Sequence, residues 1–186
     1  MNIENLIIDL SRDPFNPVLN FDVAVEYERL NQTASAVSFY LRTAEYGPTS
    51  NDERVYTALV KVAHCFDNQN DRQATVTNCL FQAIAYWPER PEAWFLLSQF
   101  NERISAWQEA YTFALAGLAC KEFPALPISV GYEGKYCLLF EKAISAYWIG
   151  RKEESLTLLR SLLTMDIASS YRIAVEENLR RLDVTV

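Results

Sequence analysis

Glycine and proline are scarce in this chain, which has five glycines and seven prolines among 186 residues. They are scattered between long stretches rich in Ala, Leu, Glu, Gln and Arg, which favour helices. This composition argues against a β-sandwich, which needs many turns. Half of the residues are apolar, so the chain can bury a sizeable core and disorder is not expected. The sequence therefore predicts long helices joined by few turns.

Long apolar runs and clusters of basic residues are also missing. The apolar run from Leu6 to Ile8 is too short for a secretion signal, and no stretch reaches the roughly 18 apolar residues of a membrane-spanning helix. The formal net charge is −7, an acidic balance that repels nucleic-acid phosphates and anionic lipid headgroups. We therefore expect a cytoplasmic protein that binds neither nucleic acid nor membranes.

Residues that build catalytic or metal sites are few. His64 is the only histidine, and Cys65 cannot share a helical face with it, so a zinc site around His64 is the disfavoured alternative. Glu153 and Glu154 are expected in the first turn of a helix, where negative charge suits the helix dipole, rather than as a catalytic pair. An enzyme would need a cleft with convergent titratable groups. We predict no catalytic residue, no cofactor and no metal.

The four cysteines form no C-x-x-C pair. Each lies among apolar or small neighbours, as expected for a core position. A disulfide or redox motif is therefore less expected than free, buried thiols at Cys65, Cys79, Cys120 and Cys137.

The clearest internal repeat begins at Pro91, where PEAWFLLSQFNERISAWQEAYTFALAGL has the pattern of two amphipathic helices joined near Ile104 and Ser105. It resembles a tetratricopeptide repeat, a helical hairpin of 34 residues with a large aromatic, a leucine and several small residues at set positions. The small residues let the two helices approach closely, and one unit alone cannot bury its apolar face, so neighbouring repeats are expected. The matching residues are Trp94, Leu97, Ser98, Ala110 and Gly117.

We therefore predict an all-α fold, a right-handed tetratricopeptide-like superhelix of about four helical hairpins, in a single domain over residues 1–186. A short helix from Ile3 to Leu10 precedes the array and a capping helix over 167–183 follows it. The four repeats are placed at 17–48, 53–88, 91–122 and 135–165.

Two irregularities interrupt the predicted array. The polar turn around Asn68, DNQNDR, is longer than the repeat pattern allows. A loop rich in proline and glycine, from Lys121 to Gly134, is inserted between the third and fourth repeats. Inserted loops of this kind often carry function.

A further resemblance rests on SFYLRTAEYGP, AIAYWPERPEAWFLLSQFNE and GKYCLLFEKAISAYWIGRKEES. Over roughly residues 17 to 165 the chain resembles the helical-repeat segment that accompanies family-2 glycosyltransferases in some bacterial, phage and viral proteins. In that family a separate α/β domain carries the chemistry through a D-x-D-type metal motif, and no D-x-D occurs in this sequence. The resemblance therefore implies an accessory or adaptor module without its enzyme.

The candidate binding site follows from the repeat pattern. Tetratricopeptide proteins usually hold a peptide in a groove lined by positions 2, 5, 9, 12 and 13 of each first helix, and a mixture of aromatics and arginines is typical of interaction hot spots. The competing interpretation places aromatics at helical spacing in the core, as we expect for Trp94, Trp107 and Phe113. The predicted groove residues are Phe21, Glu28, Arg29, Arg54, Lys61, His64, Phe95, Gln99, Glu102, Arg103, Phe140, Tyr147 and Trp148.

The predicted function is that of a protein-interaction scaffold or adaptor, which binds a peptide or protein in this groove. The alternative is an accessory module of a glycosyltransferase system that helps to bind an acceptor glycan or protein. The identity of the partner stays open at this point.

Overall fold

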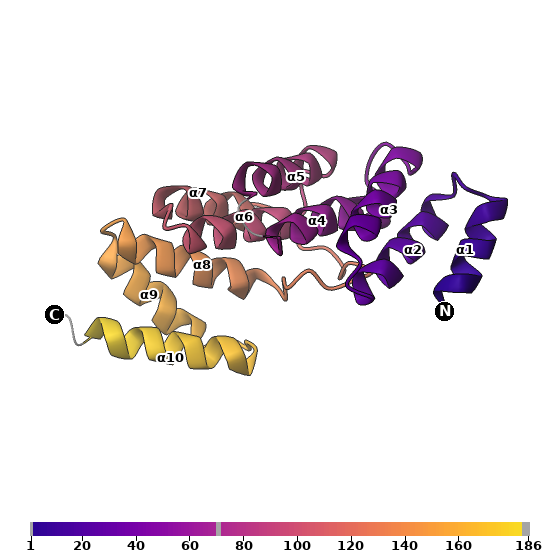
Figure 1. The fold of residues 1–186 in the computed structure, drawn as a ribbon. Helices are drawn as coiled ribbons and strands as arrows, with labels where there is room; N and C mark the ends of the chain where they lie inside the picture. The colour runs from indigo at the N-terminus through magenta and orange to yellow at the C-terminus, as the bar shows by residue number, and fades with distance from the viewer. Residues whose placement is uncertain (1, 70–71, 184–186) are drawn as a thin grey trace. The chain divides into compact units, whose positions relative to one another are not determined.

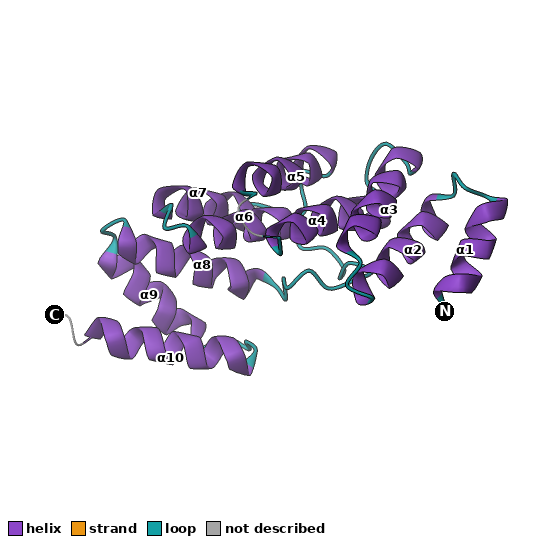
Figure 2. Ribbon diagram, viewed as in Figure 1, coloured by secondary structure: helices purple, strands orange, loops and turns teal. Residues whose placement is uncertain are grey.

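The computed structural model describes residues 2–69 and 72–183, and over these ranges the chain forms helices and loops but no strand (Figure 1, Figure 2). The predicted all-α fold is therefore confirmed. Along the chain the helices are α1 (Ile3–Arg12), α2 (Pro17–Arg29), α3 (Thr33–Tyr46), α4 (Glu53–Asp67), α5 (Gln73–Tyr86), α6 (Glu92–Arg103), α7 (Trp107–Leu118), α8 (Lys135–Trp148), α9 (Lys152–Leu162) and α10 (Ser169–Asp183).

Local sequence explains where several helices begin. The Asn16 side chain accepts hydrogen bonds from the backbone N–H groups of Val18 and Leu19, and Pro17 occupies the first position of α2. Asp52 caps α4 in the same way. Such side chains satisfy amide groups that have no partner inside the helix, and proline costs nothing at the first position because its missing N–H would be unpaired there.

The turns that end α2, α6 and α8 share one geometry. Asn31, Ser105 and Gly150 each adopt a positive φ, of 57°, 61° and 87°. The next residue donates its N–H to the carbonyl five positions earlier, over 2.9, 2.9 and 2.8 Å, in the pattern of a Schellman turn. The three first helices therefore correspond residue by residue. Three sets of predicted groove residues become equivalent: Phe21, Phe95 and Phe140; Glu28, Glu102 and Tyr147; Arg29, Arg103 and Trp148.

The chain divides into two compact units, for which the sequence pattern contains no signal. Unit 1 comprises Met1–Pro88 and Pro124–Val130, and unit 2 comprises Glu89–Phe123 and Gly131–Val186. The middle of the predicted inserted loop thus belongs to unit 1. As predicted, residues 121–134 contain no helix. The longer polar turn predicted around Asn68 includes residues 70 and 71, which lie outside the described residues.

In unit 1, each helix packs against the next one along the chain, and α2 also contacts α4 (Figure 1). Alanines at the contacts let the helices approach closely. A smaller group, Leu6, Leu10 and Val23, attaches α1 to α2. The main group of buried side chains, which we call the unit 1 cluster, consists of Phe21, Ala24, Ala36, Tyr40, Ala58, Val62 and Cys65.

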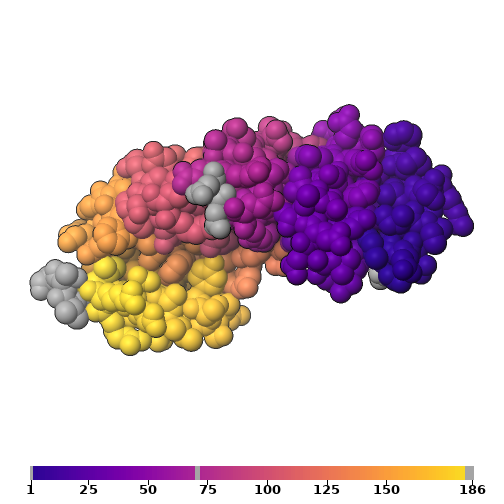
Figure 3. All heavy atoms as spheres, viewed as in Figure 1, coloured from indigo at the N-terminus to yellow at the C-terminus, as the bar shows by residue number. Residues whose placement is uncertain are grey.

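In unit 2, α6 packs on α7, α7 on α8 and α8 on α9, and α6 also contacts α8. Helix α10 packs against α8 and α9, and its yellow spheres lie against the orange ones of the preceding residues in Figure 3. Its role as a cap of the array stays a prediction. Gly117 lies where α7 meets α8: a Cβ there would come within 2.7 Å of a Leu138 methyl group and 3.1 Å of the Cβ of Trp94. The small residue of the repeat pattern is therefore required by close packing.

A buried ion pair lies at the start of α6. Arg90 is fully buried and its Nη2 lies 2.6 Å from Oε1 of Glu92, while its Nε also faces the carboxylate. The guanidinium carbon lies 5.0 Å from the ring centre of Phe123, in the first part of the inserted loop. Phe123 of the loop thus packs against the guanidinium group of this pair, within unit 2.

Candidate functional site

Two predicted groove residues of unit 1 meet as an ion pair. Lys61 Nζ on α4 lies 3.0 Å from Glu28 Oε1 on α2. The Tyr40 hydroxyl on α3 donates a hydrogen bond of 2.6 Å to the other carboxylate oxygen of Glu28. Lys61 is 8% exposed and Tyr40 is fully buried. The sequence places Glu28 and Lys61 on one surface, and the structure joins them in a contact that links three helices.

The surroundings of this ion pair keep its neighbours neutral. Burial raises the pKa of Tyr40, and its hydrogen bond to Glu28 raises it further. Burial also raises the pKa of the Cys65 thiol to about 11, with a smaller contribution from Glu28. Both groups therefore stay protonated near neutral pH. The region holds one compensated pair of charges rather than an acid–base couple.

The remaining predicted residues of unit 1 divide between surface and interior. Arg29, Arg54 and His64 are exposed, and Arg29 forms an ion pair of 2.9 Å with Glu26 on its own helix. Phe21 is only 4% exposed and packs edge-on against Tyr40, with ring centres 5.9 Å apart. Three of the predicted residues of this unit are thus available to a partner, and their role in binding stays a prediction.

In unit 2 the corresponding position carries two acids instead of an ion pair. Glu141 on α8 faces Glu102 and Gln99 of α6, and its buried carboxyl oxygen Oε2 has no hydrogen-bond partner among the described residues. Glu141 is 3% exposed. Burial raises the pKa of Glu141 far above its ordinary value, and the Glu102 carboxyl raises it further. Glu141 therefore stays protonated at neutral pH.

Sequence reasoning missed Glu141. The available signal was an acidic residue inside an otherwise apolar stretch, YCLLFEKAISAYW, where every neighbour except Lys142 suits the core. Such a residue on a buried helix face needs a polar partner. The partner could not be named from the sequence, because it comes from another helix.

The three equivalent phenylalanines all lie within the fold. Phe95 is 1% exposed and packs on Tyr132, with ring centres 5.5 Å apart. Phe140 is half-buried and meets Tyr171 of α10 edge-on at 5.4 Å. Together with Phe21, they occupy positions that the competing core interpretation describes. Phe21 and Phe95 therefore offer almost no surface to a partner, whereas Phe140 is partly exposed, and the role of all three in binding stays a prediction.

An exposed aromatic group, which we call the tryptophan patch, consists of Trp107, Tyr147 and Trp148. Trp148 ends α8 and is 59% exposed, and its ring stacks on Trp107 at the start of α7, with centres 5.1 Å apart and planes 18° apart. Tyr147 meets Trp148 edge-on at 5.6 Å, and the Lys152 ammonium group lies 5.4 Å from the Tyr147 ring. Trp107, expected in the core, also packs against buried residues of unit 2.

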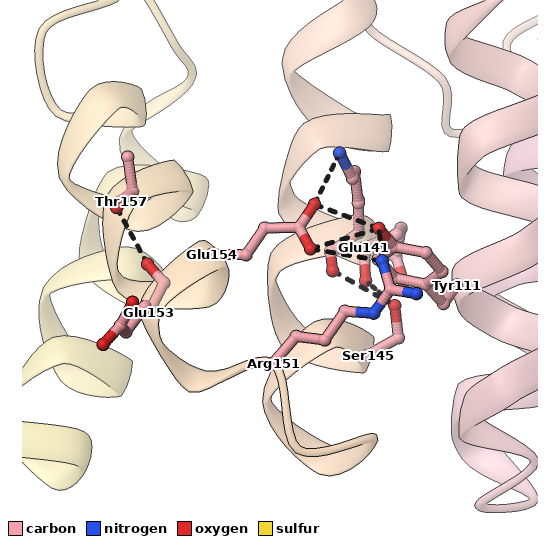
Figure 4. Close-up of polar contacts among 8 residues, drawn as sticks. Tyr111, Glu141, Ser145, Arg151, Glu153, Glu154 and Thr157 are labelled. Atoms are coloured by element: carbon pink, nitrogen blue, oxygen red, sulfur yellow. Dashed lines mark hydrogen bonds and ion pairs between the residues drawn. The ribbon is translucent and has the colours of Figure 1, made fainter.

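A polar cluster joins α7, α8 and α9 (Figure 4). Glu154, in the first turn of α9 as predicted, extends toward Tyr111 of α7, whose hydroxyl donates to its carboxylate at 3.0 Å. Lys142 lies 2.8 Å from Glu154, and Arg151 donates a 2.8 Å hydrogen bond to the Tyr111 hydroxyl. Lys142, together with Tyr111 and Arg151, lowers the pKa of Glu154. This arrangement ties α7, α8 and α9 together through charge.

Metal-binding clusters and membrane-spanning helices are not found among the described residues. Within these ranges, no three His, Cys, Asp or Glu side chains lie together as a metal ion would require. None of the described helices is both long enough and apolar enough to cross a membrane. The four cysteines are free, as predicted; Cys65 and Cys137 are buried, and Cys79 and Cys120 are half-buried.

Comparisons with known proteins place the fold. No protein-family model and no curated protein matches the chain, but solved structures do. MamA (residues 41 to the end) from Desulfovibrio magneticus RS-1 is 12% identical over 91% of this chain and 84% of its own, with a TM-score of 0.68. YrrB, described as a tetratricopeptide-repeat protein with an unusual peptide-binding site, is 10% identical over 94% and 81%, with a TM-score of 0.64. TTC0263, a tetratricopeptide-repeat protein of Thermus thermophilus, is 13% identical over 98% and 89%, with a TM-score of 0.60.

These identities are low, so the likeness concerns the fold alone. The chain has the helical-hairpin fold of tetratricopeptide-repeat proteins, as the spacing of its small and aromatic residues predicts.

Proposed function

We propose that this chain is a non-catalytic protein-interaction module that binds a peptide or protein through the tryptophan patch of unit 2. The observation that carries the proposal is the 59% exposure of Trp148, whose ring is already held by stacking on Trp107. A large aromatic side chain that is fixed before binding loses little conformational entropy when a partner covers it. Side chains of this kind dominate the energy of many interfaces.

Two further points support this function. YrrB, which has the same fold, is described as having a peptide-binding site. The exposed Lys152 beside the patch favours a partner with an acidic side chain near its apolar anchor.

Arg29, Arg54 and His64 of unit 1 remain a second predicted contact surface. A cytoplasmic location, which the four free thiols favour, remains part of the proposal.

The test is affinity capture with the full chain, followed by a binding titration of each retained protein. Trp148→Ala should weaken binding by about thirtyfold, the loss expected when an interface loses a hot-spot residue of about 2 kcal/mol. Phe15→Ala is the matched control, because Phe15 is 66% exposed but belongs to unit 1. Equal binding by the Trp148→Ala variant and the unaltered chain would show that the patch is not the site.

The alternative, an accessory role beside a glycosyltransferase, rests on the sequence resemblance together with the exposed Trp148, since exposed tryptophan faces also stack on the apolar faces of sugar rings. A glycan array separates the two functions. Glycan binding that disappears in Trp148→Ala, without any retained protein, would favour the alternative. Phe95 is unsuited to this test because it is buried, so a change there would disturb the fold as well.

A further inference from the structure

The inserted loop of the sequence contains a proline-rich segment that forms no helix. Residues Pro124–Val130 read PALPISV, with prolines at the first and fourth positions. Proline fixes its own φ and pushes the preceding residue toward an extended conformation. The segment therefore resists helix formation although its neighbours on both sides in the chain form α7 and α8.

The exposure of this segment alternates from residue to residue. Leu126, Ile128 and Val130 are half-buried, whereas Ala125, Pro127 and Ser129 are exposed. The chain bends at Pro127 and Ile128, and on both sides of the bend every second side chain turns toward a surface and the next one toward solvent. The aliphatic side chains are the ones that face inward.

The surface beneath the segment belongs to unit 1. Ile128 packs against the unit 1 cluster, and the whole segment Pro124–Val130 is part of that unit. The buried members of the cluster come from α2, α3 and α4, so the helices form this surface from their own side chains. A half-exposed, non-helical segment on such a surface lies as a bound peptide does.

We propose that the unit 1 cluster is a binding site for a short non-helical peptide with aliphatic residues at alternate positions, and that segment Pro124–Val130 fills it in cis. The partner presents the same chemistry as this segment: proline followed by Leu-, Ile- or Val-like residues spaced two apart. Because the segment is tethered, its effective concentration is of millimolar order, and a partner binds in competition with it. The site lies on unit 1 and does not depend on the tryptophan patch.

The test uses the chain's own segment as the probe. A fluorescent peptide of residues 122–132 is titrated into the unaltered full chain and into the double variant Leu126→Ser with Ile128→Ser. The variant should bind the peptide at least about tenfold more tightly, since its own segment no longer competes. The same peptide carrying both serines should bind neither protein. Absence of binding to the variant, or equal binding to both proteins, would overturn the proposal.

Cys65 provides a second measurement. Its thiol is 3% exposed within the cluster, so the double variant should be alkylated faster at Cys65 than the unaltered chain, and added peptide should restore the protection. Cys137 of unit 2, which is fully buried, reports unfolding and should stay protected throughout. Faster alkylation of Cys65 that the peptide does not reverse would overturn the proposal. Trp148 takes no part in either measurement. A negative result for the unit 1 cluster therefore does not bear on binding through the tryptophan patch, and a negative result for Trp148→Ala does not bear on the unit 1 cluster.

Discussion

Glu28 in unit 1 and Glu102 in unit 2 occupy equivalent positions before the same kind of turn, yet their partners differ in charge: one is a lysine and the other a buried acid. Each is followed by an arginine that ends its helix, and each precedes a residue with positive φ. Glu28 meets Lys61 at 3.0 Å, whereas Glu102 meets the carboxyl group of Glu141. One position of the repeat therefore faces a lysine in one unit and a buried acid in the other.

The difference shows that the repeat pattern fixes where a side chain lies but not its electrostatic environment. The turn geometry places both glutamates toward the neighbouring first helix. That helix supplies a cation in one unit and a buried acid in the other. Since the energy of a charge depends on its partner and its burial, equivalent residues make unlike contributions to stability.

The largest effect is expected when the ion pair of unit 1 is removed. Lys61→Met leaves Glu28 facing Tyr40 in a partly buried site without a cation, and we expect a loss of about 2 kcal/mol in the free energy of unfolding of unit 1. Urea denaturation at neutral pH measures this loss. Lys121→Met is the control, because its pair with Glu89 is exposed on both sides and should contribute almost nothing. Equal losses in the two variants would contradict the assigned role of Lys61.

The second largest effect is expected for Glu141→Gln, whose change in stability should depend on pH. The ordinary pKa of a glutamate is about 4.5, and that of Glu141 in the folded chain is higher. Between these two pKa values the folded chain binds more protons than the unfolded chain. The free energy of unfolding therefore falls as the pH rises above about 4.5. Glutamine cannot ionise and has nearly the shape of a protonated glutamate. Glu141→Gln should therefore gain on the order of 1–2 kcal/mol near pH 8 and little near pH 4.5.

Thermal melting of the Glu141→Gln variant across this pH range measures the gain. A gain that is the same at every pH would show that packing, rather than the buried charge, limits the stability of the unaltered chain.

A third variant places a lysine beside an acid in unit 2, as in the ion pair of unit 1. Glu102→Lys would place a cation beside Glu141 and allow the buried carboxyl group to ionise. We expect a gain of about 1 kcal/mol near pH 8, and stability that now falls as the pH drops, because the paired carboxylate must be protonated. Melting temperatures at high and low pH test the sign. A net loss near pH 8 would mean that the site cannot accommodate the lysine side chain.

The smallest effect is expected at Glu154, where the sign of the pKa shift is reversed. Lys142 first, then Tyr111 and Arg151, hold the pKa of Glu154 below its ordinary value, so its contribution is present above that value and is lost as the pH falls. Glu154→Gln should lower the melting temperature slightly at neutral pH and leave it unchanged in acid. The opposite pH dependence of Glu141→Gln makes the two variants controls for each other.

Much of the fold follows from the sequence because hairpin packing is local. The alternation of apolar faces predicts the helices, and the small residue Gly117 lies where α7 approaches Leu138, as the repeat pattern requires. The Lys121–Gly134 loop is evident from its prolines and glycines, which exclude a helix. These features depend on residues close in sequence, so the chain itself displays them.

The candidate site was predictable only in part. The pattern brought Glu28 and Lys61 to one surface and singled out Tyr147 and Trp148. It could not show that Phe95 lies under Tyr132, because that cover comes from a loop without repeat register. Exposure depends on everything that packs above a residue, and helical spacing describes only the face on which the residue lies.

The sequence by itself determined the helices, their pairing into hairpins and the turns that end the first helices, because these follow from periodicity, small residues and backbone conformation within about 30 residues. Only the tertiary structure decided the grouping into two units, the burial of Glu141 beside Glu102, the stacking of Trp148 on Trp107 and the packing of Ile128 on the unit 1 cluster. Each of these depends on side chains from separate helices or loops meeting in space. Their energies come from burial and from partner charge, and neither is written in the spacing of residues along the chain.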